Sequence, residues 1–287
     1  MITICSVGFG EAAQAFSSGW RSAPADVAAF DIKTQDAVAR DAKLADYVSR
    51  GVLGVDTLVD ALFGREAAFS LVTADQALAA AQQAAEHDLQ SLLWFDCNSC
   101  APDTKRRAAG LVEQASGRYV DVAVMAPVYP KRHEVPLLVS GPHAEVGATV
   151  LSKLGMRPMV VGEEVGQAST IKMLRSVMIK GTEALFAECF LAAQKAGVLD
   201  NVVGSLAGSN PNIEWTTQGS YTLERMLVHG GRRAAEMREV AKTLSDLGLP
   251  AGLSEATVHW QERLGALAVE PGEDALVDRL NRVLNGL

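Results

Sequence analysis

The chain has 287 residues, of which 48% are hydrophobic and 21% charged, and its formal net charge is −8 at pH 7. These values are ordinary for a globular protein, so they exclude a largely disordered or fibrous chain, and the length predicts one large domain or two unequal ones. Both halves are net acidic, which argues against nucleic acid and anionic membranes as partners.

No apolar run reaches the ~20 residues that a membrane-spanning helix needs, and no secretory leader is recognisable at the N-terminus. We therefore expect a cytoplasmic protein without a membrane partner. The four cysteines are too sparse for a disulfide framework. Cys97 and Cys100 form a lone C-x-x-C pair, and because no second pair exists the sequence predicts no metal site. The basic cluster Lys105-Arg106-Arg107 is interpreted as the solvent-facing side of a helix.

Strand and helix patterns alternate along residues 1–162. Apolar runs predict six strands, at Met1–Val7, Asp26–Phe30, Ala67–Thr73, Ser91–Phe95, Tyr119–Met125 and Pro136–Val139. Helices are predicted between some of them, at Glu11–Trp20, Ala77–His87 and Pro102–Ser116. Parallel neighbours need such crossovers, and continuous apolar strands fit a sheet covered on both faces. The pattern predicts an α/β domain with a Rossmann-type, doubly wound parallel sheet.

From Gln167 onward the sequence predicts helices and no strand, which gives an all-helical domain over residues 163–287. The expected helices are Thr170–Ala196, Leu223–Leu247, Ser254–Leu267 and Asp274–Leu284. The segment 204–219 is rich in Gly, Ser and Asn, so we expect a long loop or short helical turns there.

A glycine turn, Gly8-Phe9-Gly10-Glu11-Ala12-Ala13, follows the first predicted strand and opens the first predicted helix. This G-x-G-x-x-A pattern allows a tight turn, a close approach of backbone to a pyrophosphate, and phosphate binding at the helix N-terminus. Asp31 ends the next strand, where an acid holds the ribose hydroxyls of a dinucleotide. We therefore predict that residues 1–162 bind a dinucleotide through Gly8, Phe9, Gly10, Glu11, Ala12 and Asp31. A carboxylate repels a 2′-phosphate, so NAD is favoured, although nearby Lys33 leaves NADP possible.

The predicted helix Thr170–Ala196 is apolar nearly all round, which is typical of a buried helix. One narrow polar stripe interrupts it, because Lys172, Ser176, Lys180 and Glu183 recur at spacings of four, four and three residues. Either this stripe is the wet edge of the helix or it lines a cleft. A lysine in a half-dry cleft has a tunable pKa and can act as a general acid or base.

These features together resemble the β-hydroxyacid dehydrogenase superfamily, which includes 3-hydroxyisobutyrate dehydrogenase and phosphogluconate dehydrogenase. The motifs that carry the resemblance, in the order of that superfamily, are the glycine turn, Val72-Thr73-Ala74-Asp75, Asp96 to Pro102, Asp121-Val122-Ala123-Val124, and Gly166 to Lys172. The resemblance implies that Lys172 is the general acid/base, that Thr73 and Ala74 pass near the nicotinamide, and that Asn98 and Ser99 orient the substrate. It also implies a homodimer formed through the helical domain.

Some positions depart from the superfamily. Ser176 stands where it usually has Asn, Asn98 replaces the first residue of a Ser-Thr pair, and Met125-Ala126-Pro127 replaces Ser-Gly-Gly. The last change removes backbone N–H groups that would hold a substrate carboxylate. The run from Lys172 to Gly181 resembles a branch whose C-terminal domain has no known function.

We expect other cations to contact an anionic substrate. In that branch Arg175, Ser176 and Lys180 look like part of the signature. His133 follows the altered loop, and Arg232 or Arg233 stands in a region where the superfamily often places a substrate-contacting lysine.

The sequence thus predicts an NAD(P)-dependent dehydrogenase or reductase that interconverts an alcohol and a carbonyl on a small, polar, hydroxyacid-like substrate, with Lys172 and Ser176 as catalytic residues. Two alternatives stay open. One is an imine reductase on the same fold, and the other is a dinucleotide-binding sensor without turnover.

Overall fold

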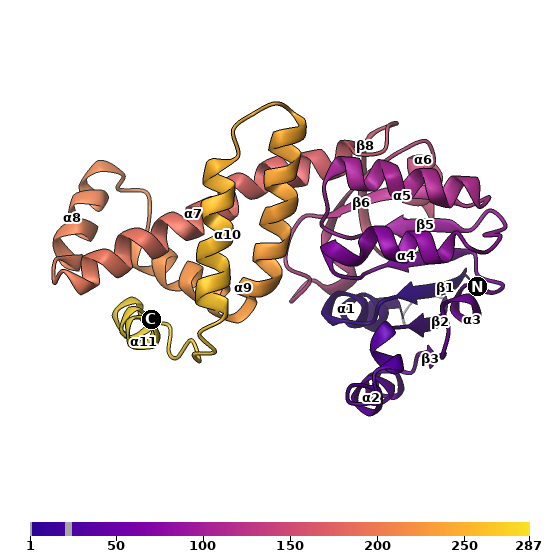
Figure 1. Ribbon diagram of the computed structural model, residues 1–287, viewed down its shortest axis with the longest axis horizontal. Helices are drawn as coiled ribbons and strands as arrows, with labels where there is room; N and C mark the ends of the chain where they lie inside the picture. Colours follow the sequence, from indigo (N-terminus) through magenta and orange to yellow (C-terminus); the bar gives the residue numbers. More distant parts are fainter. Residues whose placement is uncertain (1, 21–24) are drawn as a thin grey trace. The chain divides into compact units, whose positions relative to one another are not determined.

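The computed structural model describes residues 2–20 and 25–287, and it divides into two compact units, Met1–Met173 and Leu174–Leu287 (Figure 1). The sequence predicted a boundary between residues 162 and 163. The observed division lies later because the first turns of helix α7 (Gln167–Lys195) are bonded to the sheet of the first unit.

The described residues of the first unit form one eight-stranded sheet with the order β3-β2-β1-β4-β5-β6-β7-β8. The strands are β1 (Ile2–Val7), β2 (Ala25–Phe30), β3 (Leu53–Gly54), β4 (Ala67–Ser70), β5 (Leu93–Asp96), β6 (Arg118–Val124), β7 (Pro136–Ser140) and β8 (Arg157–Gly162). Every neighbouring pair is parallel except β6 and β7, which are antiparallel. The predicted Rossmann-type fold is confirmed, and the antiparallel pair β6 and β7 makes the sheet mostly rather than entirely parallel.

All six predicted strands are present, although β4 ends at Ser70 rather than Thr73, and Met1 lies outside the described residues. Strands β3 and β8 were not predicted. β3 has only two residues, and β8 is a partly exposed edge strand in which Met159 is 58% exposed, so neither has a continuous apolar pattern.

Helices join the strands of the first unit. They are α1 (Glu11–Trp20), α2 (Arg40–Arg50), α3 (Leu58–Leu62), α4 (Ala77–Ala84), α5 (Pro102–Gln114) and α6 (Ala144–Lys153), with short 3-10 turns η1 (Ile32–Gln35), η2 (Ala74–Gln76) and η3 (Arg132–Glu134). The predictions of α1, α4 and α5 are confirmed, whereas α2, α3 and α6 were not predicted.

Two apolar cores cover the two faces of the sheet, because alternate residues of a strand point to opposite sides. Leu93 and Phe95 of β5 join the core that contains Trp20 and Phe69, while Trp94, between them, joins the core on the other face. The predicted burial of the sheet on both faces is confirmed.

The second unit is helical. It contains the remainder of α7, then α8 (Leu199–Ser209), α9 (Trp215–Asp246), α10 (Gly252–Gly265) and α11 (Leu276–Gly286) (Figure 1). Of the two expectations for 204–219, a long loop or short helical turns, the long loop is wrong, because only 210–214 is non-helical and the rest belongs to the helices α8 and α9. Val202, Val203 and Leu206 pack against the apolar core of this unit, and that packing outweighs the weak helix propensity of Gly and Ser. Within the described part of the chain, no helix combines the length and the apolar character needed to cross a membrane.

Candidate functional site

The glycine turn lies at the carboxyl end of β1 and opens α1. Gly8 has φ +85°, and a Cβ atom there would lie 2.6 Å from the carbonyl oxygen of Leu71, so a side chain does not fit. The Gly8 N–H donates to the carbonyl of Phe30 at 2.8 Å, which joins the turn to the end of β2. Gly10 and Glu11 are exposed at the N-terminus of α1, the position that favours an anion.

Asp31 fastens this turn from the end of β2. Its Oδ2 accepts from the Phe9 N–H at 2.7 Å and its Oδ1 from the Lys33 N–H at 3.0 Å, and the residue is 8% exposed. The Phe9 ring is buried against Tyr47, with 5.1 Å between ring centroids. A carboxylate has about four lone-pair sites, so these two bonds leave Asp31 able to accept from ribose hydroxyls.

Four strand residues lie side by side across the sheet: Val7, Ser70, Asp96 and Asp121 are in register on β1, β4, β5 and β6. We call them the edge row. The predicted cofactor loop begins just after Ser70, and the Asn98 segment begins just after Asp96. The structure therefore brings these two segments and the glycine turn to one edge of the sheet, where α/β proteins bind ligands. Thr73 is exposed there and Ala74 is buried.

Asn98 holds the two loops together. Its Oδ1 accepts from the Val72 N–H at 2.8 Å, and its Nδ2 donates to Ser70 Oγ at 2.9 Å and to Asp96 Oδ1 at 2.8 Å. Both amide hydrogens are thus donated within the protein, and the residue is 3% exposed. The hydroxyl of the neighbouring Ser99, by contrast, is buried and has no hydrogen-bond partner among the described residues.

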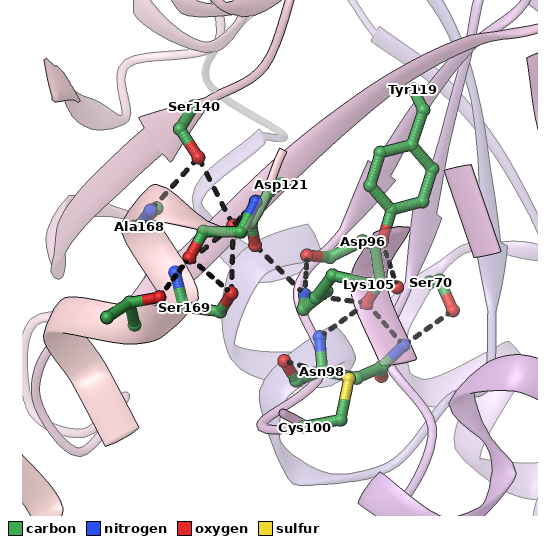
Figure 2. Close-up of polar contacts among 12 residues, drawn as sticks. Ser70, Asp96, Asn98, Cys100, Lys105, Tyr119, Asp121, Ser140, Ala168 and Ser169 are labelled. Atoms are coloured by element: carbon green, nitrogen blue, oxygen red, sulfur yellow. Dashed lines mark hydrogen bonds and ion pairs between the residues drawn. The ribbon is translucent and has the colours of Figure 1, made fainter. Parts of the chain in front are cut away.

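The two acids of the edge row, Asp96 and Asp121, belong to a buried charge cluster with Lys105 (Figure 2). The Lys105 Nζ lies 2.6 Å from the carbonyl oxygen of Asp96, 2.9 Å from Asp96 Oδ1 and 3.4 Å from Asp121 Oδ1. The Tyr119 hydroxyl donates to Asp96 Oδ2 at 2.6 Å. All four residues are 0% exposed. Burial alone lowers the pKa of Lys105, but the negative charges of Asp96 and Asp121 outweigh it and the pKa is raised.

The prediction that Lys105 lies on the solvent-facing side of a helix, together with Arg106 and Arg107, is wrong. The two arginines are exposed, but Lys105 is buried. The signal that could have found it is helical spacing, because Lys105 stands three, four and seven residues before the small apolar residues Ala108, Ala109 and Val112, which are also buried.

The start of α7 is fixed to the same cluster. Asp121 Oδ2 accepts from the N–H groups of Gly166 and Ser169, both at 3.1 Å, from Ser169 Oγ at 3.0 Å and from Ser140 Oγ at 3.2 Å (Figure 2). A carboxylate at this place satisfies free helix N–H groups and suits the positive end of the helix dipole.

Lys172 lies on the next turn of α7 and is half-buried. Burial raises the pKa of the Cys97 thiol to about 12, and the positive charges of Lys105 and Lys172 act on that thiol in the opposite direction. Lys172 is therefore close enough to the segment that follows β5 for its charge to be felt there.

The polar stripe of α7 continues into the second unit, where it faces inward. Ser176, Lys180 and Glu183 are 6%, 5% and 3% exposed. Lys180 Nζ lies 3.2 Å from Ser176 Oγ and 2.9 Å from Glu236 Oε2. The idea that the stripe is the wet edge of the helix is therefore wrong.

Glu183 pairs with Arg233, whose Nε lies 3.0 Å from Glu183 Oε2, and accepts from Gln261 Nε2 at 2.8 Å. Lys180 and Arg233 are thus both ion-paired within the second unit, whereas Arg175 is exposed. Their contacts with substrate stay predictions.

The expectation that the apolar residues of α7 are buried is wrong on one side of the helix. Ile171, Leu174, Met178 and Leu185 are 42%, 40%, 70% and 59% exposed. At 100° per residue they lie within one 60° sector, opposite the buried polar stripe. We call these four residues the apolar stripe of α7.

His133 lies apart from the site residues. It packs against Gly19, near the C-terminal end of α1, and against Gly155, which follows α6. These neighbours belong neither to the edge row nor to the start of α7, and His133 Nδ1 is buried without a hydrogen-bond partner in the described structure. A substrate contact by His133 stays a prediction.

Comparison with known proteins relates the whole chain to one group. A family described as a domain of unknown function (DUF1932) matches residues 193–264. The structure of a conserved hypothetical protein from Sinorhizobium meliloti is 37% identical, with 100% of this chain and 97% of that chain covered and a TM-score of 0.76. A conserved protein of unknown function, with a reported structural similarity to 3-hydroxyacid dehydrogenases, is 29% identical over 92% of this chain and 97% of its own, with a TM-score of 0.70.

A curated relative, an uncharacterized 28.5 kDa protein of Methanothermus fervidus, is 27% identical over 52% of this chain, and the match spans 57% of that protein. Two further structures show the fold alone. They are a 3-hydroxyisobutyrate dehydrogenase of Mycobacterium tuberculosis (14% identical, 99% of each chain, TM-score 0.71) and an imine reductase variant of Myxococcus stipitatus in complex with NAD+ (21% identical, 99% of each chain, TM-score 0.58).

The fold and the edge of the sheet define a protein of the 3-hydroxyacid dehydrogenase-like class, an N-terminal Rossmann-like unit followed by long helices. The chain belongs to the same family as the S. meliloti protein, and its residues 193–264 match the DUF1932 domain.

The buried thiols predict that the protein loses stability at alkaline pH. Burial raises the pKa of both Cys5 and Cys97 to about 12 from 9.0. The unfolded chain releases these protons first, so their contribution is complete below pH 9 and is lost as the pH rises to 12, by at most about 1.4 kcal/mol per pH unit for each thiol. Urea unfolding between pH 7 and pH 11 measures this loss.

The control for this prediction is the exposed Cys189. Cys97→Ala is expected to flatten the alkaline loss of unfolding free energy, whereas Cys189→Ala leaves it unchanged. An equal pH profile for wild type and Cys97→Ala would contradict the assignment.

Proposed function

We propose that the protein is an NAD(P)-dependent oxidoreductase that interconverts an alcohol and a carbonyl on a small, polar, hydroxyacid-like substrate. The observation that carries the proposal is the shared edge of the sheet. A glycine turn fastened by an acid lies there together with the fixed start of the helix that carries Lys172. The fold is that of NAD(P)-dependent dehydrogenases, which supports this function.

The residues present fit a dinucleotide. Gly8 leaves room where a Cβ atom would collide, the exposed N-terminus of α1 suits a pyrophosphate, and Asp31 retains acceptor sites for ribose hydroxyls. A bound nicotinamide dinucleotide would supply the hydride exchange. We infer a preference for NAD over NADP, because a 2′-phosphate would meet the carboxylate of Asp31.

Proton handling falls to Lys172. Its amine takes the hydroxyl proton of an alcohol substrate during oxidation and returns it during reduction. Asn98 donates both of its amide hydrogens within the protein, and the Ser99 hydroxyl is buried, so contacts of these two residues with a substrate stay predictions. Ser176 follows Lys172 by one helical turn, but its hydroxyl accepts from Lys180 Nζ, so a catalytic contact by Ser176 stays a prediction.

The proposed cofactor preference is tested by titrating the protein fluorescence with NADH and NADPH. NADH is expected to bind at least tenfold more tightly, a difference of about 1.4 kcal/mol. Asp31→Asn keeps the size of the side chain and should narrow the ratio severalfold. Asp36→Asn, at an exposed acid a few residues later, is the matched control and should leave the ratio unchanged. Binding of neither nucleotide would refute the dinucleotide site.

The proposed reaction is tested with a panel of hydroxyacids, sugar acids and cyclic imines. On any substrate that turns over, Lys172→Ala should lower kcat by about 10² to 10⁴, the usual contribution of general acid–base catalysis, and should leave the Kd for NADH unchanged. Lys195→Ala, at an exposed lysine on the last turn of α7, is the control. Near-normal turnover by Lys172→Ala would contradict the role of Lys172.

The same panel separates the alternatives. Turnover of cyclic imines alone would replace the proposed reaction by imine reduction. Nucleotide binding without turnover of any substrate would favour a sensor.

We also propose that a second copy of the chain covers the apolar stripe of α7. The polar side of this helix is satisfied inside its own unit, whereas the apolar side is open to water, which is the reverse of an ordinary surface helix.

Light scattering should therefore give about twice the chain mass of 30.4 kDa. A double variant, Met178→Glu with Leu185→Glu, is expected to be monomeric. Val38→Glu, at a valine that is 93% exposed in the first unit, should not change the mass. A monomeric wild-type protein would contradict the proposed dimer.

A further inference from the structure

The proposed reaction assigns no step to the buried charge cluster of Lys105, Asp96 and Asp121. Asp96 and Asp121 are register neighbours on adjacent parallel strands, and both are 0% exposed. Two buried carboxylates at adjacent positions repel each other, and burying charge is costly unless each charge is paired. The ammonium group of Lys105 contacts both of them. Through these two carboxylates Lys105 is connected to the loop beside the glycine turn and to the start of α7.

The first connection runs from Lys105 to the glycine turn. Asp96 Oδ1 accepts from Lys105 and from both the backbone and side-chain N–H groups of Asn98, at 2.8 to 3.0 Å. Asn98 in turn accepts from the Val72 N–H. Leu71 and Val72 are the residues that a Cβ atom at Gly8 would strike, so this loop lies directly against the glycine turn.

The second connection runs from Lys105 to α7. Asp121 Oδ1 faces the ammonium group, and Asp121 Oδ2 receives the N–H groups of Gly166 and Ser169 at the start of the helix (Figure 2). Gly166 has φ +104°, and a Cβ atom there would lie 3.2 Å from Pro102 and from the Arg106 guanidinium, so the entry into the helix is tightly packed against α5. Lys172 follows Ser169 by three residues, which is less than one turn.

We propose that Lys105 is a positioning residue with two connections. Through Asp96 and Asn98 it fixes the loop of residues 71–73, which lies against the glycine turn. Through Asp121 it fixes the first turn of α7, which carries Lys172. The claim that this arrangement serves catalysis rests on the proposed function. All of the contacts lie within the first unit. A lysine suits the task because its ammonium group has three donors on a flexible stem and can satisfy two carboxylates on neighbouring strands.

Hydrogen exchange tests the positioning, with or without a cofactor. In Lys105→Met, the amides of residues 71–73 and of 166–170 should exchange about tenfold faster, while those of β1 and β2 keep their protection. Asn98→Ala should affect residues 71–73 alone. Arg107→Met, at an exposed arginine on the same helix, is the matched control. An unchanged exchange pattern, or a uniform increase over the whole sheet, would overturn the proposal.

A milder variant serves if Lys105→Met does not fold. Tyr119→Phe removes only the 2.6 Å hydrogen bond to Asp96 and leaves every charge in place. It should speed exchange at residues 71–73 severalfold and leave residues 166–170 unchanged. No change at residues 71–73 would contradict the first connection.

NADH titration of the same variants separates positioning from a merely structural role. Lys105→Met and Asn98→Ala should each weaken NADH binding about tenfold, and the double variant should be no weaker than the single ones, because the lysine acts through the asparagine. Additive effects, or an unchanged Kd in a destabilised Lys105→Met, would overturn the proposal. If the wild-type protein binds neither NADH nor NADPH, the proposed function fails, and the exchange pattern still decides whether Lys105 positions these segments.

Discussion

The ammonium group of Lys105, held between the carboxylates of Asp96 and Asp121, is the constraint on which the organisation of the first unit depends. Three ionised groups at 0% exposure are expensive to remove from water, and only complete pairing makes such a cluster stable. Asp96 meets this condition through Asn98 and Tyr119, and Asp121 Oδ2 through four donors that include two N–H groups at the start of a helix. Asp121 Oδ1 has no hydrogen bond among the described residues and faces only the Lys105 ammonium group, at 3.4 Å. Each of these bonds also fixes a segment that borders the candidate site.

In the second unit, buried charges of α7 are neutralised by ion pairs between separate helices. Its polar residues are contributed in pairs by separate helices, Lys180 with Glu236 and Glu183 with Arg233, and Gln261 adds a further donor to Glu183. These contacts join α7 to α9 and α10. Because the polar side of α7 faces inward, its apolar stripe lies at the surface. Exposing these apolar side chains to water is unfavourable.

These contacts give a physical reason for some of the positions at which the sequence departs from the superfamily that it resembles. Asn98 stands where the resembling superfamily has the first residue of a Ser-Thr pair. Its side-chain amide bonds to Val72, Ser70 and Asp96, so this replacement ties the loops after β4 and β5 together. Ser99 keeps an unpartnered hydroxyl within the described structure. Asp31 likewise has a double use, because it fastens the glycine turn through Phe9 and still has acceptor sites available.

The sequence by itself determined the alternation of strands and helices, the helical second half, the glycine turn and the acid at the end of β2. These are local patterns, in which periodicity and turn chemistry act over a few residues. Only the tertiary structure decided which carboxylates Lys105 pairs with, that Asn98 donates both of its amide hydrogens within the protein, and that the polar side of α7 faces inward. Those outcomes depend on partners distant in sequence, such as Asp121 for Lys105 and Arg233 for Glu183, and spacing along one helix cannot show which of its two sides those partners will occupy.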